Sequence, residues 1–286
     1  MPAIPQTKNA VARLQHLKEH LSFQSTPAHR AVWIDGLTNL TLDRDRGVLI
    51  KLLIGYCWAA ALSFWYQSGD IRRVKNLFYN IGKLEYIGVV EKWTSGSYRR
   101  YTYTNTMDSM PIFVSDYPDL IQWCAESNFG LADSDRKEKL HLSEFFVKNI
   151  YLAMRKQWDE LEERCRRYIA NPKPRPYHRM VIFEFQFLLA LATGDIPKME
   201  AVLSEFVTPR GLRTYSANES AFTNGLINTT GLLFAKLAWQ NGYEININSP
   251  YIPQEWLAVQ PLEHYEDEFD FMKAYTIDPT WGATSV

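Results

Sequence analysis

Three times along this chain, a strongly apolar segment ends in a short polar turn and is followed by a segment with helical periodicity. The apolar segments are Val48–Tyr66, Phe145–Met154 and Met180–Leu191. After each turn, apolar residues recur with the spacing i, i+3, i+7 and i+10, starting at Ile71, Trp158 and Ile196. Two helices joined by a short turn pack against each other in antiparallel directions. The pattern therefore predicts a mainly α fold built from antiparallel helical hairpins.

Helix-initiation signals support two of these hairpins. Asp70 and Asp195 each follow a glycine and precede the amphipathic helix, where a carboxylate accepts hydrogen bonds from free backbone N–H groups. Helical-repeat folds have periods of roughly 34–47 residues. The second amphipathic helix begins about two such periods after the first, and the third begins about one period after the second. Such spacing fits a solenoid-like stack and an irregular bundle, and both remain open.

One segment interrupts the helical pattern. Tyr86–Thr106 is rich in Tyr, Thr and Val around Ser95-Gly96-Ser97, which predicts a short β-hairpin or an extended insertion near 86–106. No linker rich in Pro, Gly or Ser separates two halves of the chain. We therefore expect residues 1–286 to form a single mainly α-helical domain.

The overall composition disfavours several classes of protein. With 46% hydrophobic and 22% charged residues, the chain is globular in composition. A formal net charge of -1 gives no global attraction to nucleic acids or anionic membranes. The three cysteines lack a C-x-x-C pair, which suits reduced thiols, and the N-terminal stretch lacks the features of a secretory signal. These features predict a cytoplasmic location.

One segment is long enough to cross a bilayer. Val48–Tyr66 has the required length, but Lys51 lies within it and the chain leads directly into a second helix. We therefore interpret it as the buried helix of a globular hairpin and expect no membrane partner.

A search for catalytic motifs finds few candidates. The sequence HLKEH, His16–His20, matches the H-x-x-E-H arrangement of some zinc proteases. The same helix, however, carries the apolar stripe Leu14, Leu17 and Leu21, which is expected to pack against the rest of the protein. Glu184 is a lone carboxylate in an apolar helix, and no second catalytic group lies at a helical spacing from it. We interpret it as a buried, hydrogen-bonded carboxylate rather than a general acid or base. The sequence predicts no catalytic residue, no metal site and no cofactor, and so not an enzyme.

Charge is distributed unevenly along the chain. Arg164–Arg179 contains six Lys or Arg residues and no acid, with Tyr168 and Tyr177 interspersed. It is therefore a candidate for contact with nucleic acid. Its prolines favour a different interpretation, an exposed loop between helices. Leu262–Met272 contains five acidic residues and no Lys or Arg. It is predicted to be a solvated helix with its apolar residues inward, or a protein-binding face for a basic partner.

A further ordered pattern occupies Gly231–Leu257, "GLLFAKLAWQNGYEININSPYIPQEWL". An apolar helix is expected to end at Gly242, because glycine readily adopts the left-handed conformation that closes helices. Ile245 and Ile247 then alternate with polar residues, as in a short extended segment. Pro253 suits the first turn of a short helix that follows.

This order of features resembles the C-terminal pattern of the immunity protein 49 family of bacterial polymorphic-toxin systems. The shared pattern is a helix bearing A-K-L-A-W, a glycine end, an alternating Ile/Val stretch, then S-P and P-x-E. Thr230-Gly231 departs from it, since family members are expected to carry Pro near the helix start. The resemblance implies a cytoplasmic antitoxin that binds and neutralises a cognate protein toxin by stoichiometric occlusion, with nucleases prominent among the toxins. It carries over no catalytic residues.

The predicted toxin-binding surface combines the acidic segment with two nearby aromatic residues that we expect to be exposed. It comprises Glu263, Glu266, Asp267, Glu268, Asp270, Tyr251 and Trp256. Tyr98–Tyr103 is the second candidate face. The alternative functions are a helical-repeat scaffold for host proteins and a nucleic-acid-binding protein that uses Arg164–Arg179. The sequence does not determine the oligomeric state.

Overall fold

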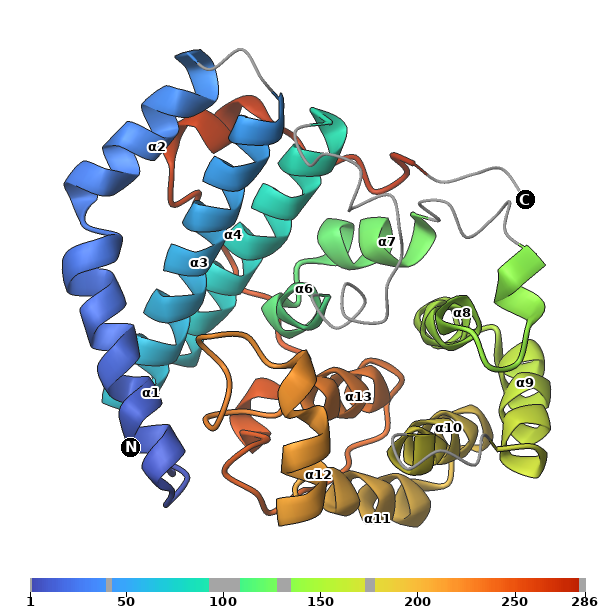
Figure 1. Cartoon of the computed structure of the whole chain (residues 1–286). Helices are drawn as coiled ribbons and strands as arrows, with labels where there is room; N and C mark the ends of the chain where they lie inside the picture. The colour runs from blue at the N-terminus through green and yellow to red at the C-terminus, as the bar shows by residue number, and fades with distance from the viewer. Residues whose placement is uncertain (1, 40–42, 93–108, 128–134, 173–177, 283–286) are drawn as a thin grey trace.

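A computed structural model describes residues 2–39, 43–92, 109–127, 135–172 and 178–282 (Figure 1). These residues are mainly helical, and no strand occurs among them. The α-helices are α1 (Lys8–Glu19), α2 (Pro27–Asn39), α3 (Asp43–Ser68), α4 (Ile71–Val90), α6 (Met110–Ser115), α7 (Pro118–Glu126), α8 (Ser143–Met154), α9 (Trp158–Ala170), α10 (His178–Thr193), α11 (Ile196–Phe206), α12 (Pro209–Tyr215) and α13 (Thr229–Gln240). Shorter helical turns are η1 (His20–Gln24), η2 (Asp135–Glu138), η3 (Ser216–Asn218), η4 (Gln254–Trp256) and η5 (Asp270–Ala274).

The two helices of each predicted hairpin are in contact: α3 with α4, α8 with α9, and α10 with α11. The turns are built as the sequence suggests. Gly69 and Gly194 both have φ of +71°, which glycine adopts without strain. The Asp70 carboxylate accepts from the Arg73 N–H at 3.1 Å, and that of Asp195 accepts from the Lys198 N–H at 3.0 Å. Helix α9 also contacts α10 (Figure 1). The solenoid-like order and the single domain stay predictions.

One apolar core joins the N-terminal helices to the end of the chain. It extends from Ala10 in α1 to Ile277 and includes residues of α3, α4 and α13. Trp256 has no exposed surface, and its ring meets those of Trp65 and Phe78 at centroid distances of 5.5 and 5.2 Å. The turn η4 therefore packs between α3 and α4, although it lies far from both in the sequence.

Helix α3 contains the stretch that could cross a bilayer. Among the described residues, Arg46–Ser68 alone is long and apolar enough, and 56% of its apolar window is buried inside the protein. The helix contacts α1, α2 and α4. This burial supports the interpretation of α3 as the core helix of a hairpin.

The β-hairpin prediction near 86–106 is wrong at its beginning. Tyr86–Val90 form the last turn of α4, and Tyr86 and Ile87 are buried there. Aromatic and β-branched residues favour strands, but burial against neighbouring elements outweighs so weak a preference. The rest of the predicted insertion, residues 93–106, lies outside the described residues, as does the candidate face Tyr98–Tyr103.

The pattern of Gly231–Leu257 is confirmed in outline. Helix α13 begins at Thr229, and the Asn228 side chain accepts from the Gly231 N–H at 2.7 Å. The helix ends at Gln240, and Gly242 closes it with φ of +82°, while the Tyr243 N–H donates to the Ala238 carbonyl at 3.0 Å. These two features are the ones expected of a glycine-closed helix end. The short turn η4 follows Pro253, as the sequence suggested.

After η4, residues 258–281 run alongside α4, and we call them the strap (red in Figure 1). The strap has no regular structure before η5. Its position is fixed by side chains of α4 and of the corner between α6 and α7.

The close approach of α4 to α6 and α7 depends on Gly82. A Cβ atom at this position would lie 2.8 Å from Leu120 and 2.9 Å from Ile112. In Gly82→Ala, overpacking is expected to lower the free energy of unfolding by ~1–3 kcal/mol, measured by urea denaturation. Gly55→Ala in α3 is the control, since its Cβ would meet only the Phe222 ring, at 3.3 Å. There, higher helix propensity predicts no loss, and an equal loss at both positions would contradict the packing argument.

Candidate functional site

Helix α4 is buried on two faces. Its apolar face, which the sequence predicted, carries Val74 and Phe78, both 0% exposed. Its second face is polar, and its side chains are only 0% to 8% exposed: Lys75, Asn76, Asn80 and Lys83. Buried polar groups need hydrogen-bonding partners. The strap supplies them.

Two asparagines one helical turn apart bind the strap backbone. Asn76 accepts from the Glu266 N–H at 2.8 Å and donates to the Glu266 carbonyl at 3.1 Å. Asn80 donates to the same carbonyl at 2.9 Å and accepts from the Glu268 N–H at 2.7 Å. A carboxamide carries both a donor and an acceptor, so it pairs with a peptide group as a neighbouring strand would. We call this pair the asparagine ladder.

Two strap carboxylates point toward the protein and are paired there. Lys83 Nζ lies 2.9 Å from both oxygens of Asp267, and the pair is almost buried, with 7% and 11% of the side chains exposed. Arg73 lies 2.8 Å from Glu268, which also accepts from the Tyr56 hydroxyl at 2.9 Å. Burial, together with the neighbouring Glu268 carboxylate, raises the pKa of Tyr56, so its phenol stays a donor.

The other acidic residues of the predicted surface face solvent. Glu263, Glu266 and Asp270 are exposed, and Asp270 pairs with the exposed Lys273 at 2.6 Å. The strap therefore divides its carboxylates into an inward pair that fixes its position and an outward set. Binding of a toxin to any of them stays a prediction.

The expectation that Trp256 is an exposed aromatic anchor is wrong. Its indole is 0% exposed because it fills the space between α3 and α4, where burying a large aromatic surface is most favourable. Tyr251 is partly exposed, and its carbonyl accepts from the Asn228 N–H at 2.8 Å.

The predicted helix over Leu262–Met272 is also wrong, because helical structure begins only at Asp270. Phe269 and Met272 are buried, as expected, and Tyr265 is partly buried. The asparagine ladder takes the backbone groups that a helix would use internally, and this competition explains the extended course.

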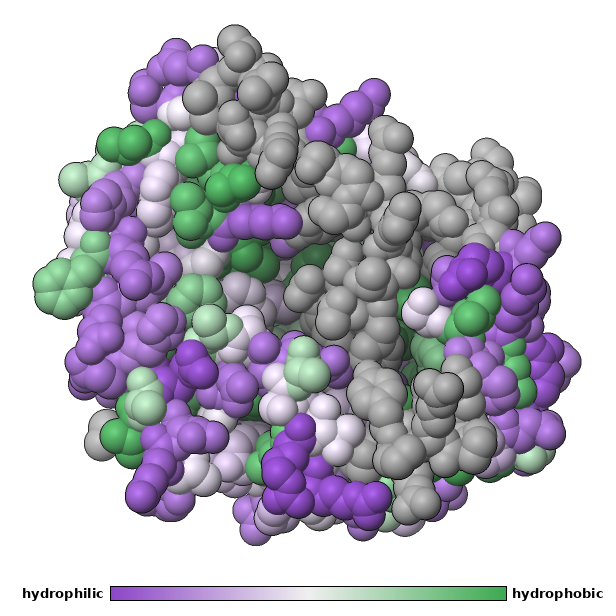
Figure 2. Space-filling model, viewed as in Figure 1, coloured by the Kyte–Doolittle hydropathy of each residue, from purple (hydrophilic) through white to green (hydrophobic). Residues whose placement is uncertain are grey.

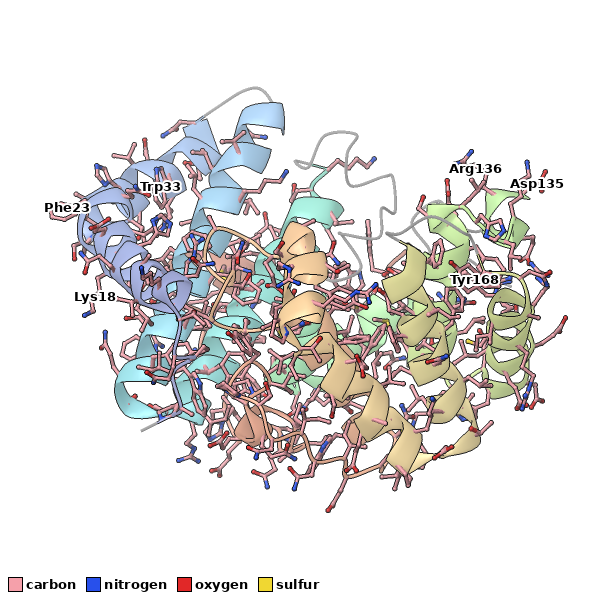
Figure 3. All side chains as sticks on the ribbon, turned by 60° about the horizontal axis from the view of Figure 1, so that its bottom comes forward. Lys18, Phe23, Trp33, Asp135, Arg136 and Tyr168 are labelled. Atoms are coloured by element: carbon pink, nitrogen blue, oxygen red, sulfur yellow. The ribbon has the colours of Figure 1, made fainter. Side chains whose placement is uncertain are left out.

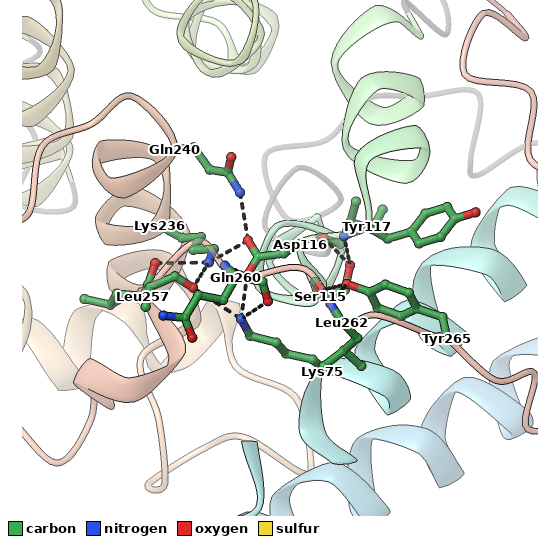
Figure 4. A network of polar contacts seen from close by, with 12 residues as sticks. Lys75, Ser115, Asp116, Tyr117, Lys236, Gln240, Leu257, Gln260, Leu262 and Tyr265 are labelled. Carbon is green, nitrogen blue, oxygen red and sulfur yellow. Dashed lines mark hydrogen bonds and ion pairs between the residues drawn. The ribbon is translucent and has the colours of Figure 1, made fainter. Parts of the chain in front are cut away.

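A buried network of charges fixes the start of the strap (Figure 4). Asp116, at the corner between α6 and α7, lies 2.6 Å from Lys75 of α4 and 2.8 Å from Lys236 of α13. It also accepts from Gln240 Nε2 at 2.9 Å and from the Gln260 N–H at 3.0 Å. At most 4% of any of these three charged side chains is exposed. One carboxylate thus joins three elements and the strap.

The two lysines share that carboxylate and complete their hydrogen bonding on backbone carbonyls. Lys236 donates to the carbonyls of Leu257 and Ala258, both at 3.0 Å, and Lys75 donates to that of Gln260 at 2.8 Å. Burial lowers the pKa of Lys236 to about 8, although Asp116 acts in the opposite direction. The network has the form of a structural clamp, since each of its charged groups is bonded to other members or to backbone groups.

The basic segment Arg164–Arg179 is partly used inside the protein. Arg164 is 3% exposed, donates to Asn149 and pairs with Glu138, both at 2.6 Å. Tyr168, proposed to stack on bases, is 0% exposed and stacks on Phe185 at 3.9 Å, among the helices α8, α9 and α10 (Figure 3). That part of the nucleic-acid hypothesis is wrong. Residues 173–177 lie outside the described residues.

The remaining chemical candidates serve packing. His20 is buried, its Nδ1 lies 2.8 Å from Gln24, and burial lowers its pKa. His16 and His20 both pack on the Phe222 ring, at 5.9 and 4.9 Å. Across the described ranges, no three His, Cys, Asp or Glu residues are grouped as metal ligands. Glu184 is 4% exposed and is not left without a partner.

A family model described as immunity protein 49 matches residues 109–256, more than half of the chain. The chain therefore belongs to the immunity protein 49 family, and the resemblance of Gly231–Leu257 is confirmed. The matched region includes Asp116 and Lys236, whereas α4 and the strap lie outside it. No curated protein and no solved structure matches the chain.

Sequence reasoning missed the two features that fix the strap. Asn76, Asn80 and Lys83 follow a helical spacing opposite the apolar stripe, a pattern that is typical of a solvated face. Lys236 lies between Ala235 and Leu237 in a strongly apolar helix, which was a signal of a buried charge needing a partner. Asp116 had no comparable signal, because its sequence neighbours do not distinguish a corner residue from a surface one.

Removing the shared carboxylate is expected to destabilise the protein strongly. Asp116→Asn leaves two buried ammonium groups without a counter-ion and should lower the free energy of unfolding by ~3–5 kcal/mol, measured by urea denaturation. Lys236→Met is the control, because it keeps the pair between Lys75 and Asp116 and fills a similar volume. Its loss should be clearly smaller. Equal losses would show that the shared charge is not what stabilises the corner.

Glu219 makes stability depend on pH. Its Oε1 accepts from the Thr229 N–H at 2.8 Å and from the Thr229 hydroxyl at 3.0 Å. Burial raises its pKa to about 7, so the folded protein holds a proton that the unfolded chain releases near its ordinary value of 4.5. The contribution of Glu219 to the free energy of unfolding therefore decreases as pH rises from about 4.5 to about 7.

The variant Glu219→Gln imitates the protonated form at every pH. Relative to wild type, it should gain stability progressively above pH ~5 and reach a plateau of ~1–3 kcal/mol above pH ~7. Thermal and urea unfolding between pH 4 and pH 8.5 measure this difference. Glu205→Gln removes an exposed carboxylate of α11 and controls for net charge. A difference that does not change with pH would contradict the assignment to Glu219.

Proposed function

We propose that this protein is an immunity protein that acts in the cytoplasm, where it binds a cognate bacterial toxin and neutralises it by stoichiometric occlusion. Membership of the immunity protein 49 family carries this proposal. The toxin-binding surface is the outward side of the strap, with Glu263, Glu266 and Asp270 as its acidic residues and Tyr251 at its edge.

The structure supports this surface through its rigidity. Asp267 and Glu268 are held by Lys83 and Arg73, and the asparagine ladder holds the backbone between them. Exposed carboxylates on a fixed backbone lose little conformational entropy on binding. Val259, 41% exposed, adds an apolar side chain to the strap.

Charge suggests the kind of toxin. An acidic face fits a basic groove, because opposite charges speed encounter and disfavour wrong partners. Nucleases carry such grooves, since they must bind phosphate backbones. The proposed toxin is therefore a nuclease whose basic substrate groove is covered by the strap.

The surface over α2 and α3 offers a different chemistry. In the view of Figure 2, hydrophobic residues gather over α2 and α3 among hydrophilic ones. The exposed apolar residues there include Val32 and Val48, at 68% and 52% exposed. Phe23, 72% exposed, lies at the outer edge of the N-terminal helices (Figure 3). These residues carry no charge that would select a basic partner, so we place the toxin contact on the strap.

The test uses the cognate toxin, sought in the gene adjacent to that of this protein. The double variant Glu263→Lys/Glu266→Lys should weaken toxin binding at least tenfold and lose protection on co-expression, while its melting temperature stays within ~2 °C, since exposed substitutions change stability little. Biolayer interferometry at two salt concentrations measures affinity and association rate. Most of the loss should be in the association rate.

A matched control separates a local effect from a change in net charge. Glu163→Lys/Glu205→Lys reverses two exposed carboxylates on α9 and α11. This control should bind the toxin as wild type does. Unchanged affinity of the strap variant, or an equal loss in the control, would remove the strap from the proposed interface.

A further inference from the structure

The polar face of α4 has the properties of a receptor for an extended peptide. The asparagine ladder contacts the N–H and carbonyl groups of Glu266 and the N–H of Glu268, and Lys75 contacts the carbonyl of Gln260. Contacts of this kind are made to main-chain atoms and do not depend on the side chains of the bound segment. In known peptide-binding modes, main-chain bonds give affinity while side-chain pockets give specificity.

Contacts to particular side chains of the strap lie beside the ladder. Lys83 and the Tyr79 hydroxyl, which donates to Asp267 Oδ1 at 3.1 Å, form a site of hydrogen-bond donors for an aspartate. Arg73 and Tyr56 form a second one for a glutamate. Burial, reinforced by Asp267, raises the pKa of Tyr79, which keeps its hydroxyl proton available for this bond.

Aromatic positions flank the two carboxylates. The ring of Tyr265 lies 5.1 Å from that of Tyr79 and 5.0 Å from that of Tyr117. Phe269 is 5% exposed, and its ring lies 6.0 Å from that of Tyr56. The Glu266 side chain between them is exposed. The polar face of α4 thus recognises the pattern Tyr-x-Asp-Glu-Phe. Any residue fits at position x, because the side chain there is exposed.

The strap is held in the manner of a bound ligand. Within the described residues, no backbone–backbone hydrogen bond joins residues 258–269 to another element. Its polar contacts with the rest of the protein pass through side chains of α3, α4, α13 and the corner at Asp116, or through its own side chains. A segment bound in this way can leave its site without breaking the hydrogen bonding of any helix.

We propose that the polar face of α4 is a peptide-binding site for an extended acidic segment of the form Tyr-x-Asp-Glu-Phe. The chain fills the site with its own residues 265–269, and the site accepts the same segment from a second copy of the chain. The internal segment has an effective concentration on the order of mM, so it excludes the external one unless its own contacts are weakened. If one copy has a weakened segment and a second copy has a weakened site, the segment of the second copy should therefore bind the site of the first. This inference does not depend on any toxin.

Two full-length variants test the exchange. The acceptor, Asp267→Asn/Glu268→Gln, keeps the α4 face and weakens its own strap; the donor, Lys83→Met, keeps its strap and weakens its own site. Mixed at equal concentrations, they should form a heterodimer in size-exclusion chromatography with light scattering, whereas each alone should form at least tenfold less dimer. Two folded variants, shown by circular dichroism, that stay monomeric on mixing would overturn exchange between copies.

A peptide titration tests the site itself. The probe is a fluorescent synthetic peptide of residues 258–275, and its anisotropy is followed as the acceptor variant is added. Saturable binding is expected, at least tenfold tighter than to wild type, whose own strap competes. A peptide carrying the Asp267→Asn and Glu268→Gln changes should bind at least tenfold more weakly. Equal binding of the two peptides, or none, would refute recognition by the α4 face.

A second experiment tests the site if the acceptor variant fails to fold. A protease site is inserted after the exposed Glu263 of the otherwise wild-type chain, which is folded and then cleaved. The released fragment should stay associated, and an excess of the labelled peptide should replace it under native conditions. Exchange only after global unfolding would show that the strap is part of the core rather than a ligand.

Discussion

The carboxylate of Asp116 is the point on which the arrangement of helices depends. It lies between the ammonium groups of Lys75 and Lys236, at 2.6 and 2.8 Å, and it also accepts from the Gln260 N–H. Burying three charges is costly, and the cost is offset only while every member keeps its partners. The α4 helix, the corner between α6 and α7, helix α13 and the start of the strap must therefore be in place together. The hydrophobic core packs these elements, but the shared carboxylate fixes their relative positions.

The strap shows how one acidic segment serves two purposes. Asp267 and Glu268 face α4 and are neutralised by Lys83 and Arg73, while Glu263 and Glu266 remain in solvent. Because the inward carboxylates and the asparagine ladder fix the backbone, the outward ones keep a defined spacing. The same arrangement underlies both proposals: an acidic surface for a partner, and a separable ligand on the α4 face.

Much of the helical framework was predictable because it rests on local signals. The apolar periodicity beginning at Ile71, Trp158 and Ile196, and the caps at Asp70 and Asp195, depend on residues close together in the sequence. The strap was not predictable in the same way. Its helical periodicity at Tyr265, Phe269 and Met272 is real, but Asn76 and Asn80, almost two hundred positions away, take the backbone groups that a helix would need.

By itself the sequence determined the helices of the three hairpins, the caps at Asp70 and Asp195, the glycine-closed end of α13 and the family, because each is a matter of neighbouring residues and their order. Only the tertiary structure decided which charges face solvent. Asp267 and Glu263 are both carboxylates in one acidic run, and nothing local distinguishes them. Their difference arises from Lys83, which reaches Asp267 from another element at 2.9 Å, and a partner so distant in the sequence leaves no trace beside the residue it binds.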